Sequence, residues 1–171
     1  MMKLFKKKEL GSSVVELLLY MAILSVFLIV LTRIFISALD VQLESEAGSA
    51  IEQDGNYILA KLAYDMHRAK SINAPSSYGL PAANNFQIVI NSENYSYSID
   101  ANNNLILTNN SGINALNSYD SSVSVFSIQR LGNGKVEDTL KINYTIESRT
   151  KRISGNEAPR NYQTTLSLSR Q

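Results

Sequence analysis

A run of 19 residues, Val14 to Thr32, contains one charged side chain, that of Glu16. A helix of this length spans about 28 Å, which is close to the hydrocarbon thickness of a bilayer. The run therefore predicts a helix that crosses a membrane once. Arg33 follows the run, and four lysines precede it: Lys3, Lys6, Lys7 and Lys8. Such a basic segment favours a cytoplasmic amino terminus, so the remainder of the chain is expected outside the cytoplasm.

Glu16 does not fit the two ordinary explanations of such a run. A secretory signal peptide has a shorter apolar region and a small-residue cleavage site, and no such site follows at Arg33–Ala38. A plain signal anchor needs no carboxylate, which costs about 2.5–3.5 kcal/mol at the centre of a bilayer. The cost is lower near a helix start, where the side chain reaches the headgroups, so a tolerated glutamate stays an alternative. Ionisable groups inside membranes generally have a function and a partner.

The stretch KKKELG, followed by SSVVELLLYMAIL, resembles the class III leader of type IV pilins and type II secretion pseudopilins. In that family a short basic leader ends in glycine, and the fifth mature residue is a glutamate. The resemblance implies that a prepilin peptidase cleaves after Gly11, that Ser12 becomes the N-methylated first residue, and that Glu16 is the family's glutamate. The usual first residue is phenylalanine, so Ser12 departs from the pattern and favours a minor subunit.

The resemblance also implies a role for Glu16. Cleavage creates an α-amino group on Ser12, which is largely protonated at pH 7. Opposite charges attract strongly in a low dielectric. In pilins, the resemblance implies, the glutamate pairs with the amino terminus of a neighbouring subunit. The cost of burying Glu16 is then offset only when a partner docks, so the charge sets the register of assembly.

The apolar run is expected to continue as an amphipathic helix. Apolar residues near i, i+3, i+4 and i+7 spacing favour this: Ile51, Ile58, Leu59, Leu62, Met66 and Ala69. Gly48 and Gly55 predict a kink or a short break. The helix is expected to end near Ser71 to Asn73, because Pro75 disfavours helix at the residue before it.

After Pro75 the pattern changes to period two, which predicts strands. They are expected at 85–91, 94–100, 104–108, 122–130, 136–148 and 161–170, with a hairpin turn at 131–135 and irregular loops at 109–121 and 149–160. An antiparallel sheet with one face on the helix gives an α+β fold of the pilin kind. The segment 58–75 and the last strand are also similar to J-type or W-type minor pilins.

Four segments of the chain are therefore expected. They are a cleaved leader (1–11), a transmembrane and filament-core helix (12–33), its amphipathic continuation (34–73) and an extracytoplasmic sheet domain (74–171).

The sequence offers little catalytic chemistry. It contains no cysteine and a single histidine, His67, which is expected in the last turn of the helix, where the helix dipole favours it. Asp100, Asn102 and Asn104 alternate like the start of an EF-hand loop, and they are the chain's calcium candidate. Leu105 stands where that loop needs glycine, so a hairpin turn is favoured, with no metal and no cofactor. The chain is not expected to be an enzyme.

Two functional hypotheses follow. The first is a minor pilin or pseudopilin of the inner (cytoplasmic) membrane that assembles into a periplasmic or cell-surface filament. Its partners would be the prepilin peptidase, other subunits, an assembly platform and membrane lipid. Direct nucleic-acid binding is not expected, since the net charge is +1. The second is a single-pass anchored protein that keeps residues 1–11 and binds a ligand through its extracytoplasmic domain. For the basic loop at 149–160, a solvated loop is favoured over a contact with an acidic partner subunit.

Overall fold

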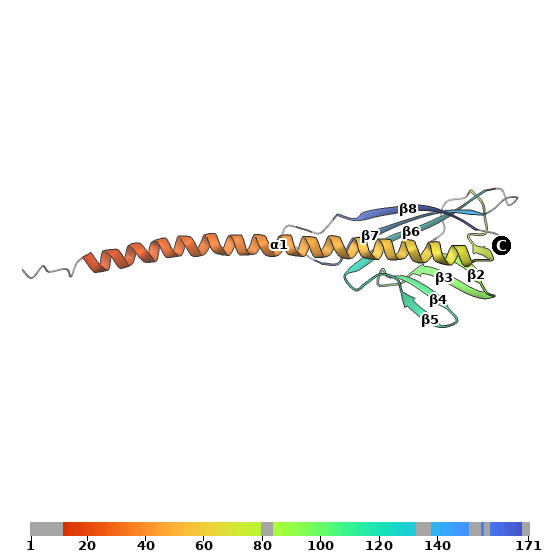
Figure 1. The fold of residues 1–171 in the computed structure, drawn as a ribbon, viewed down its shortest axis with the longest axis horizontal. Helices are drawn as coiled ribbons and strands as arrows, with labels where there is room; N and C mark the ends of the chain where they lie inside the picture. Colours follow the sequence, from red (N-terminus) through yellow and green to blue (C-terminus); the bar gives the residue numbers. More distant parts are fainter. Residues whose placement is uncertain (1–11, 80–83, 133–137, 151–154, 156–157, 169–171) are drawn as a thin grey trace, which may run out of the picture. The chain divides into compact units, whose positions relative to one another are not determined.

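The computed structural model describes residues 12–79, 84–132, 138–150, 155 and 158–168. The chain forms one long helix, α1 (Ser12–Arg68), followed by strands in two antiparallel sheets, which is an α+β fold (Figure 1). It divides into two units, Met1–Gln42 and Leu43–Gln171. In the first unit the described residues are helical throughout.

The second unit contains the end of α1 and all of the strands. One sheet has the order β1-β2-β3-β4-β5: Ser71–Ala74, Phe86–Ile90, Glu93–Ile99, Leu105–Asn109 and Gly112–Ala115. The other has the order β6-β7-β8: Ser121–Leu131, Thr139–Ser148 and Arg160–Ser167. Every neighbouring pair is antiparallel. The chain thus adds each strand beside the preceding one and changes sheet once, between β5 and β6.

The core of the second unit forms where the helix meets both sheets. The helix contributes Ile51, Ile58, Leu62 and Met66, which recur at the spacing of one helical face and are buried. The strands contribute alternating residues of the same cluster: Phe86, Ile88, Ile90, Tyr97, Leu105, Val123, Phe126, Ile128, Leu140, Ile142, Tyr144 and Ile146. Figure 1 shows this part of α1 with β6–β8 on one side and β2–β5 on the other. Both sheets therefore bury their apolar faces against the same helix.

The strand pattern of the sequence is confirmed where one face is buried. In β7, Leu140, Ile142, Tyr144 and Ile146 are buried and alternate with partly exposed residues. The predicted hairpin between β6 and β7 is present as an antiparallel pair from Ser121↔Ser148 to Leu131↔Thr139. Most of its predicted turn, residues 133–135, lies outside the described residues.

The expected helix end was wrong. The helix ends at Arg68, and Ser71–Ala74 forms β1 instead of a last helical turn. The Lys70 amide donates to the Val89 carbonyl at 2.8 Å, so the backbone immediately after the helix pairs with β2. Ile72, which falls within the expected helix, is buried as a strand residue. Tertiary pairing therefore overrides the local preference here.

Two further expectations need correction. The stretch 109–121 is not wholly irregular, because Gly112–Ala115 forms β5 against β4. The single expected sheet is two sheets, since the chain leaves the first sheet after β5. In the crossing segment the Leu116 amide donates to the Leu105 carbonyl at 2.8 Å, and the Asn117 side-chain amide donates to the Ser121 carbonyl at 2.9 Å.

The predicted break at Gly48 and Gly55 was also wrong, because α1 is helical through both residues. Gly55 instead creates room for a side chain of β8. A Cβ atom at Gly55 would lie 2.2 Å from Cζ of Tyr162, well inside the closest contact of real atoms. At Gly48 the nearest heavy atom, on Arg160, would be 3.8 Å away. Of these two helical glycines, Gly55 alone is required by the packing of its neighbours.

Candidate functional site

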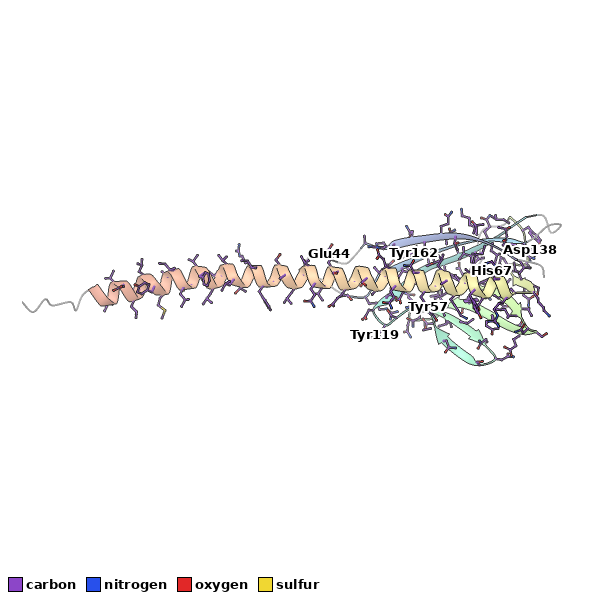
Figure 2. All side chains as sticks on the ribbon, in the orientation of Figure 1. Glu44, Tyr57, His67, Tyr119, Asp138 and Tyr162 are labelled. Carbon is purple, nitrogen blue, oxygen red and sulfur yellow. The ribbon has the colours of Figure 1, made fainter. Side chains whose placement is uncertain are left out.

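The first part of α1 leaves its apolar side chains uncovered. Throughout the stretch from Val14 to Ile36, named here the apolar segment, the large apolar side chains are 42–68% exposed within the chain. Figure 2 draws the side chains along this helix. The helix is long and apolar enough to cross a membrane, and its most apolar window has no buried residue. A soluble monomer rarely exposes such a surface, so lipid or protein is expected to cover it.

Two hydroxyl side chains of the apolar segment form hydrogen bonds to the backbone of their own helix. Ser25 Oγ donates to the Met21 carbonyl at 2.7 Å, and Thr32 Oγ1 donates to the Leu28 carbonyl at 2.8 Å. Hydroxyls commonly bond in this way to the carbonyl of the preceding turn. Neither residue therefore needs a partner from outside the helix.

Glu16 is different, because its contact is with another side chain. Tyr20 Oη donates to Glu16 Oε1 at 2.8 Å, from one helical turn further on. Both side chains are exposed on the helix surface. Sequence reasoning singled out Glu16 and missed Tyr20. The i, i+4 spacing of a hydroxyl after a lone carboxylate was the available signal.

The predicted processing site lies at the edge of the described chain. The helix begins at Ser12, so Glu16 lies one turn into it. Gly11 and the leader lysines lie outside the described residues: Lys3, Lys6, Lys7 and Lys8. The structure therefore places the carboxylate close to the predicted new amino terminus along the helix, since one turn rises about 5.4 Å.

The second unit buries two helix carboxylates, and both hold the fold together. Asp54 Oδ2 accepts hydrogen bonds from the Ser118 amide at 2.8 Å, from Ser118 Oγ at 2.7 Å and from Ser121 Oγ at 2.5 Å. These bonds attach the segment between β5 and β6 to the helix. Sequence reasoning did not find this cluster, because its members are 64 and 67 residues apart.

The second buried carboxylate, Asp65, is fully enclosed and accepts a hydrogen bond from Tyr97 Oη. Lys61 Nζ lies 3.0 Å from it, one turn back. Burial, together with the neighbouring Asp65 carboxylate, raises the pKa of Tyr97 well above the usual tyrosine value. The phenol therefore stays protonated and remains a donor, and the pair links the helix to β3.

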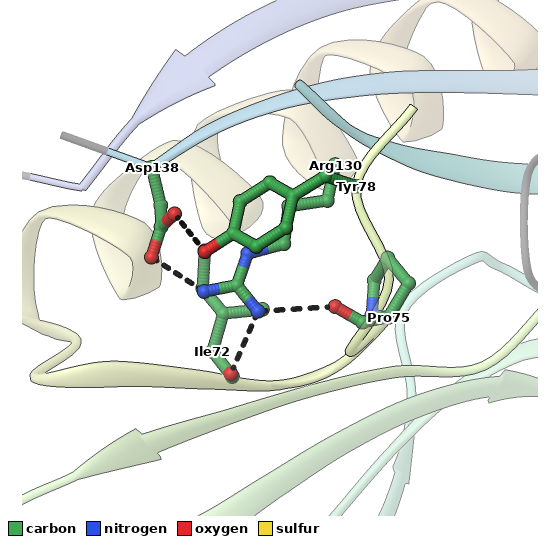
Figure 3. A network of polar contacts seen from close by, with 5 residues as sticks. All are labelled: Ile72, Pro75, Tyr78, Arg130 and Asp138. Atoms are coloured by element: carbon green, nitrogen blue, oxygen red, sulfur yellow. Dashed lines mark hydrogen bonds and ion pairs between the residues drawn. The ribbon is translucent and has the colours of Figure 1, made fainter. Parts of the chain in front are cut away.

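An arginine on β6 organises the segment that follows β1 (Figure 3). Arg130 Nη2 lies 2.5 Å from Asp138 Oδ2, and its Nη1 donates to the carbonyls of Ile72 and Pro75 at 3.4 and 3.3 Å. The guanidinium also lies 4.5 Å from the ring centroid of Tyr78, whose hydroxyl donates to Asp138. These contacts fasten the connection after β1 to the second sheet, which is a structural role.

The calcium candidate forms a β-turn between β3 and β4. Asp100 Oδ1 accepts from the amides of Asn102 and Asn104 at 2.8 and 2.7 Å, and its Oδ2 accepts from the Asn104 side chain at 2.9 Å. The backbone hydrogen bond from Asn104 is the main cause that lowers the pKa of Asp100. Both carboxylate oxygens are thus engaged within the turn. In the described part of the chain, no three acidic, histidine or cysteine side chains are grouped to hold a metal.

The arginines at the two ends of the predicted basic loop contact the second unit itself. Arg149 Nη2 donates to the Asn102 carbonyl at 2.6 Å and to Asn104 Oδ1 at 2.9 Å. Arg160 forms an ion pair with Glu52 on the helix. Both arginines therefore contribute to packing the second unit. Residues 151–154, which contain the other two basic residues, lie outside the described chain.

His67 lies exposed in the last turn of α1, as expected from its place in the sequence (Figure 2).

No family model, no curated protein and no solved structure matches this chain. The candidate site is therefore defined by the molecule's own geometry: an exposed apolar segment that carries one carboxylate and one tyrosine hydroxyl bonded to it.

Proposed function

We propose that this protein is a structural subunit of the type IV pilin and type II secretion pseudopilin kind, most similar to a minor subunit. One observation carries the proposal. The apolar segment is exposed on all sides and bears a lone carboxylate, Glu16, in the second turn of the helix. Lipid satisfies the apolar side chains but not a charge, so the pattern favours docking against a partner that carries a positive group.

The rest of the molecule is consistent with this role. The same helix that bears the apolar segment continues into the core of the second unit, where Ile51, Ile58 and Leu62 are buried between two sheets. The buried carboxylates there, Asp54 and Asp65, accept hydrogen bonds from neighbouring strands and loops. The second unit, named here the head, thus has its own packed core of helix and strands, as the pilin resemblance implies for the sheet domain.

In the proposed pathway the chain enters the inner membrane with its lysine-rich end in the cytoplasm and its head outside. A prepilin peptidase removes residues 1–11, and Ser12 receives a methyl group. The apolar segment then moves from lipid into the core of a filament. There Glu16 pairs with the amino group of a neighbouring subunit and fixes the register.

The test is the intact mass and amino-terminal sequence of the protein purified from cells that carry its own processing machinery. A chain that begins at Ser12, with or without a methyl group, is the expected result. A Gly11→Leu variant is the control, and it should retain the leader. A wild-type chain that still begins before Gly11 would contradict the pilin-type pathway and favour an anchored protein whose head binds a ligand by itself.

A further inference from the structure

The Tyr20 hydroxyl points back along the helix to Glu16, and the side-chain geometry explains why. Helical side chains lean toward the helix amino terminus, so residue i+4 covers residue i. The 2.8 Å bond joins Oη to one carboxylate oxygen, Oε1. In the described part of the chain, the second oxygen, Oε2, has no hydrogen-bond partner, and the side chains around it are more than half exposed, as Leu17, Leu19 and Tyr20 are.

We infer that Tyr20 is a positioning residue for Glu16: it holds Oε1 so that Oε2 is presented to the amino group of a neighbouring copy. This inference rests on the proposed function and adds a residue to it. A glutamate side chain has several rotamers, and docking must select one of them. A hydroxyl that already fixes the carboxylate reduces the freedom lost at docking.

The chemistry suits a tyrosine at this place. A neutral hydroxyl donates to a carboxylate without cancelling its charge, so the attraction to an incoming ammonium group is kept. A lysine or arginine at position 20 would neutralise Glu16 within its own chain and remove that attraction. Ser25 and Thr32, the other hydroxyl residues within 14–32, bond to their own backbone instead. The contact between Tyr20 and Glu16 is therefore a specific pairing within the apolar segment.

A competing explanation is that Tyr20 is an interfacial aromatic residue, whose ring lies at the headgroup level. In that case the ring matters and the hydroxyl bonds to water. Tyr20→Phe separates the two explanations, because it keeps the ring and deletes the hydroxyl. Ser25→Ala is the matched control, since it removes a hydroxyl from the same segment that does not contact Glu16.

The experiment compares five full-length chains in cells with their own processing machinery: wild type, Glu16→Ala, Tyr20→Phe, the double variant and Ser25→Ala. The assembled fraction is measured by cross-linking, relative to the membrane-bound total. We expect Tyr20→Phe to lower assembly about tenfold, as for loss of a hydrogen bond to a charged group. The double variant should be no worse than Glu16→Ala, because the two residues act as one unit.

A spectroscopic measurement supports the same comparison. In phospholipid vesicles, the infrared carboxylate band of Glu16, isolated by ¹³C-glutamate labelling and subtraction of Glu16→Ala, should shift in Tyr20→Phe and not in Ser25→Ala. If Glu16→Ala lowers assembly while Tyr20→Phe has no effect, or if the two losses multiply, the inference is wrong and the proposed function stands. If Glu16→Ala assembles normally, the inference and the register role of Glu16 are both wrong, and the subunit function is judged by cleavage after Gly11 alone.

Discussion

The ring of Tyr162 lies directly on Gly55, where even a methyl group on the helix would collide with it. The ring is not free to move aside. It stacks on Tyr144 with centroids 5.1 Å apart, and its hydroxyl donates to the Ile51 carbonyl at 3.2 Å. Tyr144 in turn donates to the Gly55 carbonyl at 2.8 Å. Gly55 is thus the place where β7 and β8 approach the helix backbone.

Gly55→Ala should therefore destabilise the head, although alanine is the better helix former. The gain in helix propensity is about 1 kcal/mol, and overpacking a fixed ring typically costs about 1–3 kcal/mol. We expect a net loss of up to about 2 kcal/mol in the free energy of unfolding. Urea unfolding followed by circular dichroism measures it. Gly48→Ala is the control, since its Cβ atom would make only an ordinary contact, and it should be neutral or stabilising. Equal stability of the two variants would show that the Tyr162 ring moves aside without cost.

Asp54→Ala should be among the more costly single changes in the head. It removes the acceptor of three hydrogen bonds and leaves the buried Ser121 hydroxyl without its acceptor, whereas the Ser118 donors can turn to water because Ser118 is exposed. Hydrogen bonds to charged groups contribute about 1.5–3 kcal/mol each and are not additive, so we expect a loss of about 3 kcal/mol. Glu52→Ala removes an exposed ion pair with Arg160 and should cost less than about 1 kcal/mol. Similar losses in the two variants would contradict the structural role of Asp54.

The head should lose stability in alkaline solution. Burial raises the pKa of Tyr97 and of Tyr144 in the folded state. Above the unfolded tyrosine pKa of about 10, the unfolded chain releases protons that the folded chain keeps. The unfolded state then binds fewer protons, so the free energy of unfolding falls as pH rises. It should be constant from pH 7 to 9 and decline above about pH 10.

Tyr97→Phe tests that origin of the alkaline decline. The variant should show a shallower decline, measured by urea unfolding at each pH together with tyrosinate absorbance. Tyr119→Phe is the control, because Tyr119 is 87% exposed, and it should keep the wild-type slope. A wild-type slope in Tyr97→Phe would assign the decline to other groups.

Glu16→Ala should separate insertion from assembly. Removing a carboxylate makes the apolar segment less costly to bury in lipid, so resistance to alkaline extraction from membranes should be unchanged. The assembled fraction should fall, because under the proposed function the amino group of the neighbouring subunit would lose its counter-charge. Thr32→Ala is the control, as its hydroxyl bonds only to its own helix in this structure. Loss of membrane insertion in Glu16→Ala would place the carboxylate in a different role.

The sequence predicts those elements whose own residues show a regular pattern of apolar and polar side chains. β7 shows its alternation because one face contacts the core, and α1 shows its length because it is apolar and then amphipathic. β5 was missed because all four of its residues are exposed and no alternation results. β1 was missed because its partner, Val89, determines its conformation. The segment that crosses between the two sheets is bonded to Asp54 on the helix, and these residues are too far apart in the sequence to form a local pattern.

The candidate site was predicted in part. Glu16 is conspicuous because a charge in an apolar run is costly. Tyr20 was not, since an aromatic residue in such a run is ordinary and only the geometry shows its hydroxyl on the carboxylate. Gly55 was noticed for the wrong reason, as a weak point of the helix, because the side chain that needs the space comes from β8.

The contact of Tyr162 with the helix also constrains how the head reaches its native state. The hydrogen bond from the Tyr162 hydroxyl to the Ile51 carbonyl joins residues 111 positions apart. The packing of β8 on the helix therefore relies on contacts between residues that are far apart in the sequence, and such contacts generally slow folding. In the proposed topology the chain crosses the membrane from its amino-terminal side, so the helix surface around Gly55 emerges before the strand that covers it. The head could then complete its packing only once β8, its last strand, has also crossed.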